Sequence, residues 1–230
     1  METLLRTAGK KPGGCAALFF LFMLPAAALN GEEFSLPPKD TWEKLFNKVE
    51  IIRTEVYREV ETGKTKWIDA YADLHTSTDI PMSSLRETIL DYEAYPRIFK
   101  RNKGMEVVRE DGRVYHDMTA GLEVLGVSYA VRFRQAVTVV VDEPDRLILD
   151  FSHVAGDGNV KDVRGGWYFE SLAGTGRVYV RYYGASRVMQ RIPLQRFFMS
   201  ILIDDETRSA LRQFLAAARK RSKNSQGNTD

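Results

Sequence analysis

The stretch that decides the fold is YAVRFRQAVTVVV, residues 129–141. Every second side chain in this stretch is apolar, and one polar residue, Gln135, interrupts the series. The apolar positions are Tyr129, Val131, Phe133, Val137, Val139 and Val141. Successive side chains of a β-strand point to opposite faces, so the alternation predicts a strand with one buried face and one face in water.

The segments that follow repeat this alternation. Apolar residues occupy alternate positions at Leu147, Leu149 and Phe151, at Val163, Trp167 and Phe169, and at Val178, Val180 and Tyr182. We expect strands over residues 49–60, 66–80, 105–108, 113–124, 127–141, 146–154, 159–172 and 177–188. Short turns such as Asp111-Gly112 separate these strands. Parallel strands need long crossover connections, so the strands are predicted to form an antiparallel meander.

Two helical segments accompany the strands. Pro81 opens the first, in which Leu85, Ile89 and Tyr92 have helical spacing, and Gly104 is the expected stop after it. The second is a helix of nearly thirty residues from Leu194 to about Arg221. Its apolar stripe consists of Leu194, Phe197, Phe198, Ile201, Leu211, Phe214, Leu215 and Ala218. A short helix over residues 41–48, capped by Asp40, is expected before the first strand pair.

These elements predict an α+β fold in which a curved antiparallel sheet wraps around the long C-terminal helix. At about 25 cal/mol per Å² of apolar area, leaving the inner sheet face in water costs tens of kcal/mol. Few elements can cover that face other than the C-terminal helix and residues 81–99. A sheet that grips one helix often closes incompletely, which leaves an apolar pocket. The alternative is a core filled by the protein's own side chains.

The N-terminal residues are typical of an export signal. Arg6, Lys10 and Lys11 precede an apolar run from Cys15 to Leu24, and small residues lead up to Ala28. We expect a signal peptide over residues 1–28, cleaved after Ala28, and a periplasmic or secreted protein; an uncleaved anchor is the alternative. The remaining boundaries are a linker over 29–39, a domain over 40–221 and a disordered tail over 222–230.

Charge and cysteine content exclude several functions for the mature chain. Without residues 1–28 it has 33 − 3 = 30 basic and 31 − 1 = 30 acidic residues, so its formal net charge is zero. Nucleic-acid binding needs a concentrated positive field, and none is expected here. The single cysteine, Cys15, lies in the leader. Disulfides, thiolate–zinc sites and cysteine nucleophiles are therefore excluded from the mature domain.

Several short motifs resemble those of the START-like, polyketide cyclase and coenzyme Q-binding superfamily, which has the helix-grip fold. The segment DYEAYPRIF, residues 91–99, resembles the segment after the first helix of these domains. Gly166-Trp167-x-Phe169, the Gly174-Thr175 turn and Ile192-Pro193 before the last helix fit the same superfamily. The resemblance covers residues 40–221. It implies an internal hydrophobic cavity for a lipid, quinone, sterol or polyketide-like ligand.

The candidate pocket residues are those expected to point inward. His153 continues the inward alternation of Leu149 and Phe151, and a buried Gln135 needs a hydrogen-bond partner. In the last helix, Asp205 and Arg208 fall on or near the inward face at a spacing that allows them to pair. The full set is Tyr129, Val131, Phe133, Gln135, Leu149, Phe151, His153, Trp167, Phe169, Tyr182, Phe198, Ile201, Asp205 and Arg208.

No catalytic or metal-binding motif stands out in the sequence. His75, His116 and His153 are far apart and lack the spacing of metal ligands, so each is interpreted as an ordinary polar residue. Arg164 and Arg181 have outward positions in their strands and are expected to be solvated. We expect no cofactor and no bound metal.

The sequence thus favours an exported binding protein for a hydrophobic small molecule or lipid, acting as a carrier, sensor or chaperone. Transient contact with an anionic membrane through Arg219 to Lys223 is an additional expectation. One alternative is an enzyme of the cyclase/aromatase or hydrolase kind that uses His153, Tyr129 and Arg208 as acid–base groups. Another is an interaction module with a filled core.

Overall fold

The computed structural model describes residues 41, 43–45, 51–60, 65–99, 104–124, 127–191 and 194–226, all within one compact unit, Ser35–Asp230. The side chains of residues 51–60, 120–129, 201, 202 and 226 are not among those described. The expected signal peptide, the linker and the Ile192-Pro193 motif lie outside the described residues. No helix within the described ranges is both long enough and apolar enough to cross a membrane.

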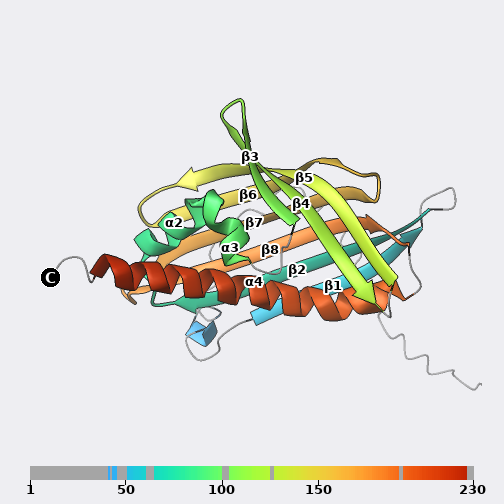
Figure 1. Cartoon of the computed structure of the whole chain (residues 1–230). Coiled ribbons are helices and arrows are strands. Elements are labelled where there is room, and N and C mark those ends of the chain that lie inside the picture. The colour runs from blue at the N-terminus through green and yellow to red at the C-terminus, as the bar shows by residue number, and fades with distance from the viewer. Residues whose placement is uncertain are drawn as a thin grey trace, which may run out of the picture. The chain divides into compact units, whose positions relative to one another are not determined.

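The strands of the described part form one antiparallel sheet (Figure 1). Their order across it is β1-β2-β8-β7-β6-β5-β4-β3. The strands are β1 (Ile51–Val60), β2 (Lys66–Thr78), β3 (Gly104–Glu110), β4 (Arg113–Val124), β5 (Val127–Asp142), β6 (Arg146–Gly156), β7 (Val160–Leu172) and β8 (Arg177–Met189). From β3 to β8 each strand pairs with the next in the chain, so the predicted antiparallel meander is confirmed.

Local turn chemistry fixes the β3–β4 hairpin. Asp111 and Gly112 have φ angles of 51° and 74°, both in the left-handed region. A two-residue hairpin turn needs this geometry to match the twist of the strands, and an Asp-Gly pair supplies it at low cost. The turn sets the register in which His116 pairs with Val107 and Met118 with Met105.

The helices that follow β2 lie on one side of the sheet. They are α2 (Met82–Leu90), the short 3₁₀ helix η2 (Tyr92–Ala94), α3 (Tyr95–Ile98) and α4 (Gln195–Gln226). The long helix α4 runs along the inner face of the curved sheet, with α2 beside it (Figure 1). The α+β helix-grip fold predicted from the sequence is therefore confirmed.

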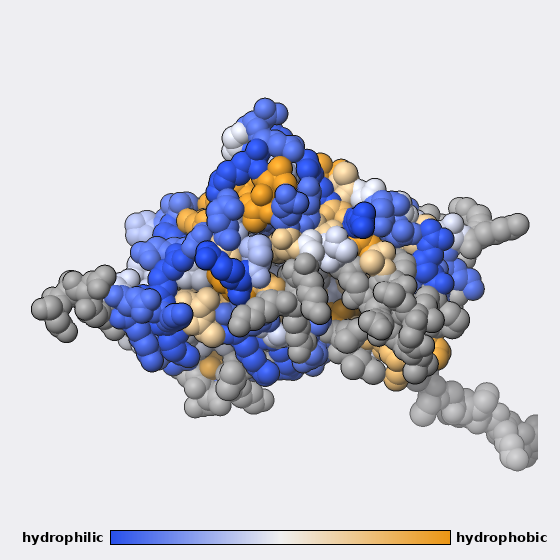
Figure 2. All heavy atoms as spheres, in the orientation of Figure 1, coloured by the Kyte–Doolittle hydropathy of each residue, from blue (hydrophilic) through white to orange (hydrophobic). Residues whose placement is uncertain are grey.

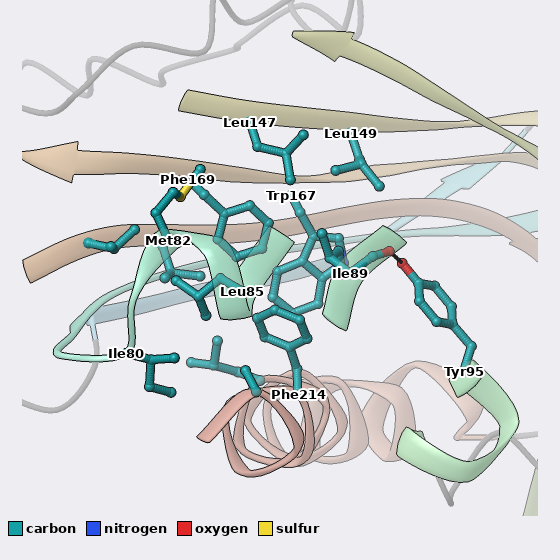
Figure 3. Close-up of a cluster of buried hydrophobic side chains, with 14 of the residues drawn as sticks. Ile80, Met82, Leu85, Ile89, Tyr95, Leu147, Leu149, Trp167, Phe169 and Phe214 are labelled. Atoms are coloured by element: carbon teal, nitrogen blue, oxygen red, sulfur yellow. Dashed lines mark hydrogen bonds between the residues drawn. The ribbon is translucent and has the colours of Figure 1, made fainter. Parts of the chain in front are cut away.

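One large core joins the helices to the sheet. Trp167 and Phe169 of β7 point toward Phe214 of α4, and Leu85 and Ile89 of α2 pack beside them (Figure 3). All five side chains are buried. A smaller cluster of Ile68, Val131, Val160 and Val188 covers the other end of the same face. Most of the apolar alternation of the sequence thus faces inward, as expected. The prediction was wrong for Val139 of β5, which is 40% exposed, and for Leu194 and Phe197 of the predicted helix stripe, which are 66% and 58% exposed.

Most strand bounds differ from the expected ones by one or two residues, and two differences have a clear physical meaning. Gly104 begins β3 instead of ending the helical segment; a Cβ there would lie 2.5 Å from Cβ of Thr119, so the close pairing of the two strands requires glycine. The helix α4 continues to Gln226, past the boundary expected at Arg221. Arg219 pairs with Asp79 at 2.8 Å, and Arg221 pairs with Asp91 at 2.5 Å. These ion pairs connect the last expected turns of α4 to residues before and after α2.

The outer face of the sheet carries buried charges that the sequence did not reveal. Arg181 is only 8% exposed, and its guanidinium donates to both carboxylate oxygens of Asp73 at 2.8 and 2.9 Å. The expectation that Arg181 is solvated was therefore wrong, although its outward position was right. Burial by itself would raise the pKa of Asp73, but hydrogen bonds from His75 and Arg181 outweigh it and hold that pKa well below its usual value. Arg164 is half-buried beside Asp162.

Candidate functional site

A cavity of about 290 Å³ lies between the inner face of the sheet and α4. Its wall is formed by residues of β2 to β8 and of α3 and α4. The volume is far above the roughly 10–15 Å³ that one water molecule needs and close to the lower end of the range for small-molecule sites. The interior is therefore not completely filled by side chains, which argues against the filled-core alternative.

Aromatic residues form one side of the cavity. The ring of Trp167 stacks on that of Tyr182 with centroids 4.4 Å apart, and Phe151 and Phe133 continue the wall on β6 and β5. Behind Trp167, the parallel ring of Phe169 lies 5.8 Å away. Rigid rings offer a large apolar contact area with little conformational entropy to lose, which suits a flat or aliphatic ligand.

Small residues create the empty space. Ala70 and Ala72 of β2 and Gly184 of β8 line the cavity where the neighbouring positions carry large side chains. A Cβ placed on Gly184 meets no heavy atom within 4 Å, so this position opens directly into free space. Gly165 of β7 also lines the cavity, but a Cβ there would lie 2.9 Å from the backbone oxygen of Tyr183. One glycine therefore makes room for a ligand, whereas the other allows close backbone approach.

Apolar side chains continue from the cavity toward the surface. Met105 of β3 lines the cavity and is only half-buried. Figure 2 shows hydrophobic side chains at the surface below the tip of the β3–β4 hairpin, surrounded by hydrophilic residues.

His116 of β4 is the most unusual polar residue of the wall. It is 1% exposed and lies among the rings of Tyr95, Tyr92 and Phe151, with centroid distances of 5.1, 6.1 and 5.9 Å. Burial lowers the pKa of His116 to about 4, so its imidazole is neutral at physiological pH. Its Nδ1 lies 3.4 Å from Nε2 of Gln135, and its Nε2 has no hydrogen-bond partner among the described residues. A buried polar atom of this kind costs about 1–3 kcal/mol.

The wall also carries the hydroxyl groups of Tyr95, Thr207 and Tyr182. The Tyr95 hydroxyl donates to the backbone oxygen of Ile89 at 2.6 Å (Figure 3), and the Thr207 hydroxyl donates to that of Ile203 at 2.6 Å. Burial raises the pKa of Tyr95 and Tyr182, so both phenols stay protonated at neutral pH. Glu206 of α4 contributes a carboxylate to the wall.

The structure places the sequence-predicted pocket residues in several environments. Those on the cavity wall are Phe133, Gln135, Phe151, Trp167 and Tyr182. Val131, Leu149 and Phe169 are buried in the surrounding core. His153 pairs with Gln135 across β5 and β6 but does not line the cavity. The side chains of Tyr129 and Ile201 lie outside the described residues.

The predicted α4 positions with described side chains, Phe198, Asp205 and Arg208, do not line the cavity. Phe198 is half-buried in the first turns of the helix, next to the ring of Phe197. Asp205 is exposed, and Arg208 lies 3.2 Å from Asp204, one turn earlier. The helix is rotated so that Ile203, Glu206 and Thr207 face the cavity instead.

Sequence reasoning missed several wall residues. The main ones are Tyr95, Phe99, Met105, His116, Met118, Glu206 and Thr207. His116 had a detectable signal, because the hairpin between β4 and β5 places it opposite Gln135. Its interpretation as an ordinary polar residue rests on the absence of a metal-ligand spacing, a criterion that does not detect a single buried imidazole. Tyr95 and Phe99 come from the DYEAYPRIF segment, whose path over the cavity depends on the tertiary fold.

The polar groups of the described cavity wall can form hydrogen bonds. Among the described residues no group of three or more His, Cys, Asp or Glu side chains could hold a metal ion. The His116 imidazole lies within hydrogen-bonding distance of the Gln135 side chain, and an amide does not titrate. The wall can therefore enclose an apolar molecule and offer it a small number of hydrogen bonds.

Comparisons with known proteins identify a matching family and similar solved structures. A family model described as polyketide cyclase / dehydrase and lipid transport matches residues 78–214. No curated protein matches the chain in sequence.

Similar solved structures include an aromatase/cyclase, Zhui, from a Streptomyces species, at 15% identity, 66% coverage of this chain, 95% of that chain and a TM-score of 0.49. Human StAR-related lipid transfer protein 5 is 11% identical, with 74% of this chain and 86% of that chain covered and a TM-score of 0.48. A STAR-related lipid transfer protein from Xanthomonas axonopodis is 12% identical, with 71% of this chain and 98% of that chain covered and a TM-score of 0.48.

Proposed function

Since the matching family model spans more than half of its 230 residues, the chain belongs to the polyketide cyclase/dehydrase and lipid transport family, and we propose that it is an exported carrier of a hydrophobic ligand. The resemblance stated from the sequence motifs is confirmed at the level of the superfamily. Family membership supports hydrophobic ligand binding; the carrier role and the export are our proposal.

The single observation that carries this proposal is the cavity of about 290 Å³ under α4. Protein interiors are normally packed as densely as organic crystals, and an empty apolar space forfeits the contacts that its lining atoms would otherwise make. Gly184, Ala70 and Ala72 keep this space open at positions where larger residues would fill it. An apolar ligand would restore those contacts.

A carrier fits the polar groups of the wall better than an enzyme does. General acid–base catalysis is most effective when the pKa of the catalytic group is near the working pH, and burial lowers that of His116 to about 4. The hydroxyls of Tyr95 and Thr207 donate to backbone oxygens. An imidazole with this pKa is a weak base, so the described wall offers little driving force for proton abstraction.

A cyclase- or aromatase-like enzyme is the second candidate. The family description includes cyclases and dehydrases, and the stacked rings of Trp167 and Tyr182 could hold a flat polyketide-like substrate. In that case His116 and Glu206 would be the candidate proton acceptors on the wall, since the phenols of Tyr95 and Tyr182 stay protonated. Turnover of an added polyketide-like substrate that is abolished by His116→Phe would favour this candidate over the carrier.

Export rests on the composition of residues 1–28. The basic residues Arg6, Lys10 and Lys11, the apolar run to Leu24 and the small residues before Leu29 support a cleaved leader. Expression of the full chain in a secreting host, followed by N-terminal sequencing of the exported protein, tests this proposal. Leu29 as the first residue supports it, whereas an intact Met1 in the membrane fraction supports the uncleaved anchor.

Membrane contact is proposed for the C-terminal half of α4. A groove of about 560 Å³ lies between this half and α2–α3, and its lining includes the basic residues Arg97 and Lys220 as well as Arg221, which is paired with Asp91. Basic side chains near an anionic surface contribute about 1 kcal/mol each. A carrier needs such contact only briefly, while it takes up or releases its ligand.

The decisive experiment for the carrier is ligand retention. Delipidated protein is incubated with a membrane extract, re-purified and analysed by native mass spectrometry for bound lipids or other apolar molecules. The matched control is Gly184→Leu, whose side chain projects into the cavity from a position with no neighbouring atom within 4 Å. We expect the wild type to retain ligand and the variant, equally folded by circular dichroism, to retain little. An empty wild-type protein would contradict the proposal.

A further inference from the structure

A polar row crosses the apolar inner face of the sheet. His116 of β4 pairs directly with Gln135 of β5, and Gln135 pairs directly with His153 of β6. Direct pairing places the three side chains on the same face of neighbouring strands. The flanking inward positions are apolar, including Met118, Phe133 and Phe151. Three adjacent polar residues in such surroundings need an explanation.

Two of these residues, His116 and Gln135, line the cavity, and both are more than nine-tenths buried. The Gln135 amide nitrogen lies 3.4 Å from Nδ1 of His116. An amide NH₂ group can only donate, so Nδ1 is the acceptor in this contact. In a neutral imidazole one nitrogen accepts and the other carries the proton, so Nε2 of His116 is an N–H donor. That donor is buried and has no partner among the described residues.

The third residue extends the row behind the cavity wall. Nε2 of His153 is likewise buried without a partner among the described residues, but His153 does not line the cavity. Gly156 is close to it, since a Cβ on Gly156 would lie 3.2 Å from this nitrogen. His153 is therefore a natural internal control for His116: it is the same residue type, paired with the same glutamine, on the other side of the row.

We propose that His116, oriented by Gln135, is a recognition site for an acceptor oxygen, such as a carbonyl, on an otherwise apolar ligand. This inference deepens the proposed function and rests on it. A bound carbonyl oxygen would accept the free N–H of His116 and remove the cost of leaving that donor buried and unpaired. A pure hydrocarbon would leave it unpaired, and a cationic group would face a donor instead of an acceptor.

The test compares two probes with the same ring system, methylnaphthoquinone, which has carbonyl oxygens, and methylnaphthalene, which has none. Their affinities for the mature domain are measured by calorimetric titration for the wild type, His116→Phe and His153→Phe. Phenylalanine keeps an aromatic ring but has no donor. We expect His116→Phe to weaken methylnaphthoquinone binding about tenfold, the usual size of one lost hydrogen bond, and to leave methylnaphthalene binding unchanged or stronger. His153→Phe should change neither affinity by more than about twofold.

A second readout needs no variant and so does not depend on variant folding. Histidine side-chain nitrogen NMR of the wild type reports which imidazole nitrogen carries the proton. We expect His116 to carry it on Nε2, and the signal of that N–H to shift when methylnaphthoquinone is added but not when methylnaphthalene is added. Protonation on Nδ1 instead would overturn the inference.

The outcomes separate the two proposals. If both probes bind and His116→Phe affects them equally, the recognition site is wrong while the hydrophobic cavity stands. If His153→Phe weakens quinone binding as much as His116→Phe does, the assignment to His116 is wrong. If neither probe binds the delipidated wild type and it also retains nothing from a membrane extract, the proposed function fails and the inference fails with it.

Discussion

The ring of Phe214, on α4, lies with its centroid 4.8 Å from that of Trp167, on β7, and 5.5 Å from that of Phe169 on the same strand. Both strand residues point inward at alternate positions, and Phe214 fills the space between them and the helix (Figure 3). This contact joins the C-terminal helix to the middle of the sheet. It is therefore the part of the core on which the helix-grip arrangement most directly depends.

Truncation of Phe214 is expected to destabilise the fold strongly. The side chain is 0% exposed, and removing a buried phenylalanine costs about 3–5 kcal/mol, from lost transfer energy and the cavity that is left. Urea denaturation of Phe214→Ala should show this loss in the free energy of unfolding. Phe197→Ala is the matched control, because Phe197 is on the same helix and 58% exposed. It should stay within about 0.5 kcal/mol of the wild type; a similar loss in both variants would contradict the packing.

The neutral state of His116 predicts a pH dependence of stability. Burial lowers the pKa of His116 from 6.5 to about 4 in the folded protein. Between these two values the unfolded chain binds a proton that the folded chain does not, so the free energy of unfolding falls as the pH falls from 6.5 to about 4. The full loss is about 3 kcal/mol, and it levels off below the folded pKa. Urea denaturation at steps through this window measures it.

The variant His116→Phe provides the control for that measurement. It has no titrating group at this position, so its stability should decline less over the same window. Asp73, whose pKa is lowered from 3.8, contributes mainly at the acidic end of this window and below it, and it contributes equally in both proteins, so the difference between their slopes reports His116. Equal slopes for the wild type and the variant would show that His116 titrates normally in the folded state.

The buried ion pair on the outer face predicts strong coupling between its partners. Asp73 and Arg181 are each 8% exposed, and replacing only one member of such a pair leaves a buried charge without its counter-ion. We expect Asp73→Ala to cost about 3–5 kcal/mol, and the double variant Asp73→Ala/Arg181→Met to cost less than Asp73→Ala alone. Chemical denaturation of the single and double variants measures the coupling energy.

The control for this coupling is the more exposed pair of Asp117 and Arg134. Their side chains are 38% and 30% exposed, and the closest nitrogen–oxygen distance is 2.6 Å. Pairs that water can reach typically contribute no more than about 1 kcal/mol. Asp117→Ala should therefore cost much less than Asp73→Ala. Equal costs would mean that burial does not determine the strength of these pairs.

The two cavity glycines predict opposite effects of alanine. At Gly184 the added methyl group meets no atom within 4 Å, so Gly184→Ala should raise stability by about 0.4–1 kcal/mol through the lower entropy of the unfolded chain. At Gly165 the methyl group would lie 2.9 Å from the Tyr183 backbone oxygen, so Gly165→Ala should cost about 1–3 kcal/mol. Thermal denaturation should give melting temperatures on opposite sides of the wild type. A loss at Gly184 would argue that the cavity is not open there.

The secondary structure was largely predictable because it follows from local rules. The expected strand over 113–124 has the observed bounds of β4, and the expected end of the strand before Gly174 coincides with the end of β7 at Leu172. The Asp111-Gly112 turn has the positive φ angles that its residues favour. The cavity residues were less predictable. Tyr95 and Glu206 reach the wall because of how their helices are oriented against the sheet, and the spacing of apolar residues along a strand or helix does not specify that orientation.

The sequence by itself determined that alternate apolar residues on successive strands must share an interior with the last helix, because side-chain alternation and the cost of wet apolar surface are properties of the chain alone. Only the tertiary structure decided which polar groups enter that interior. It placed His116 beside Gln135 within the cavity wall, buried Arg181 against Asp73 outside it, and extended α4 to Gln226. Each of these depends on residues far apart in the chain, whose desolvation and pairing energies exist only once the strands and helices have been brought together.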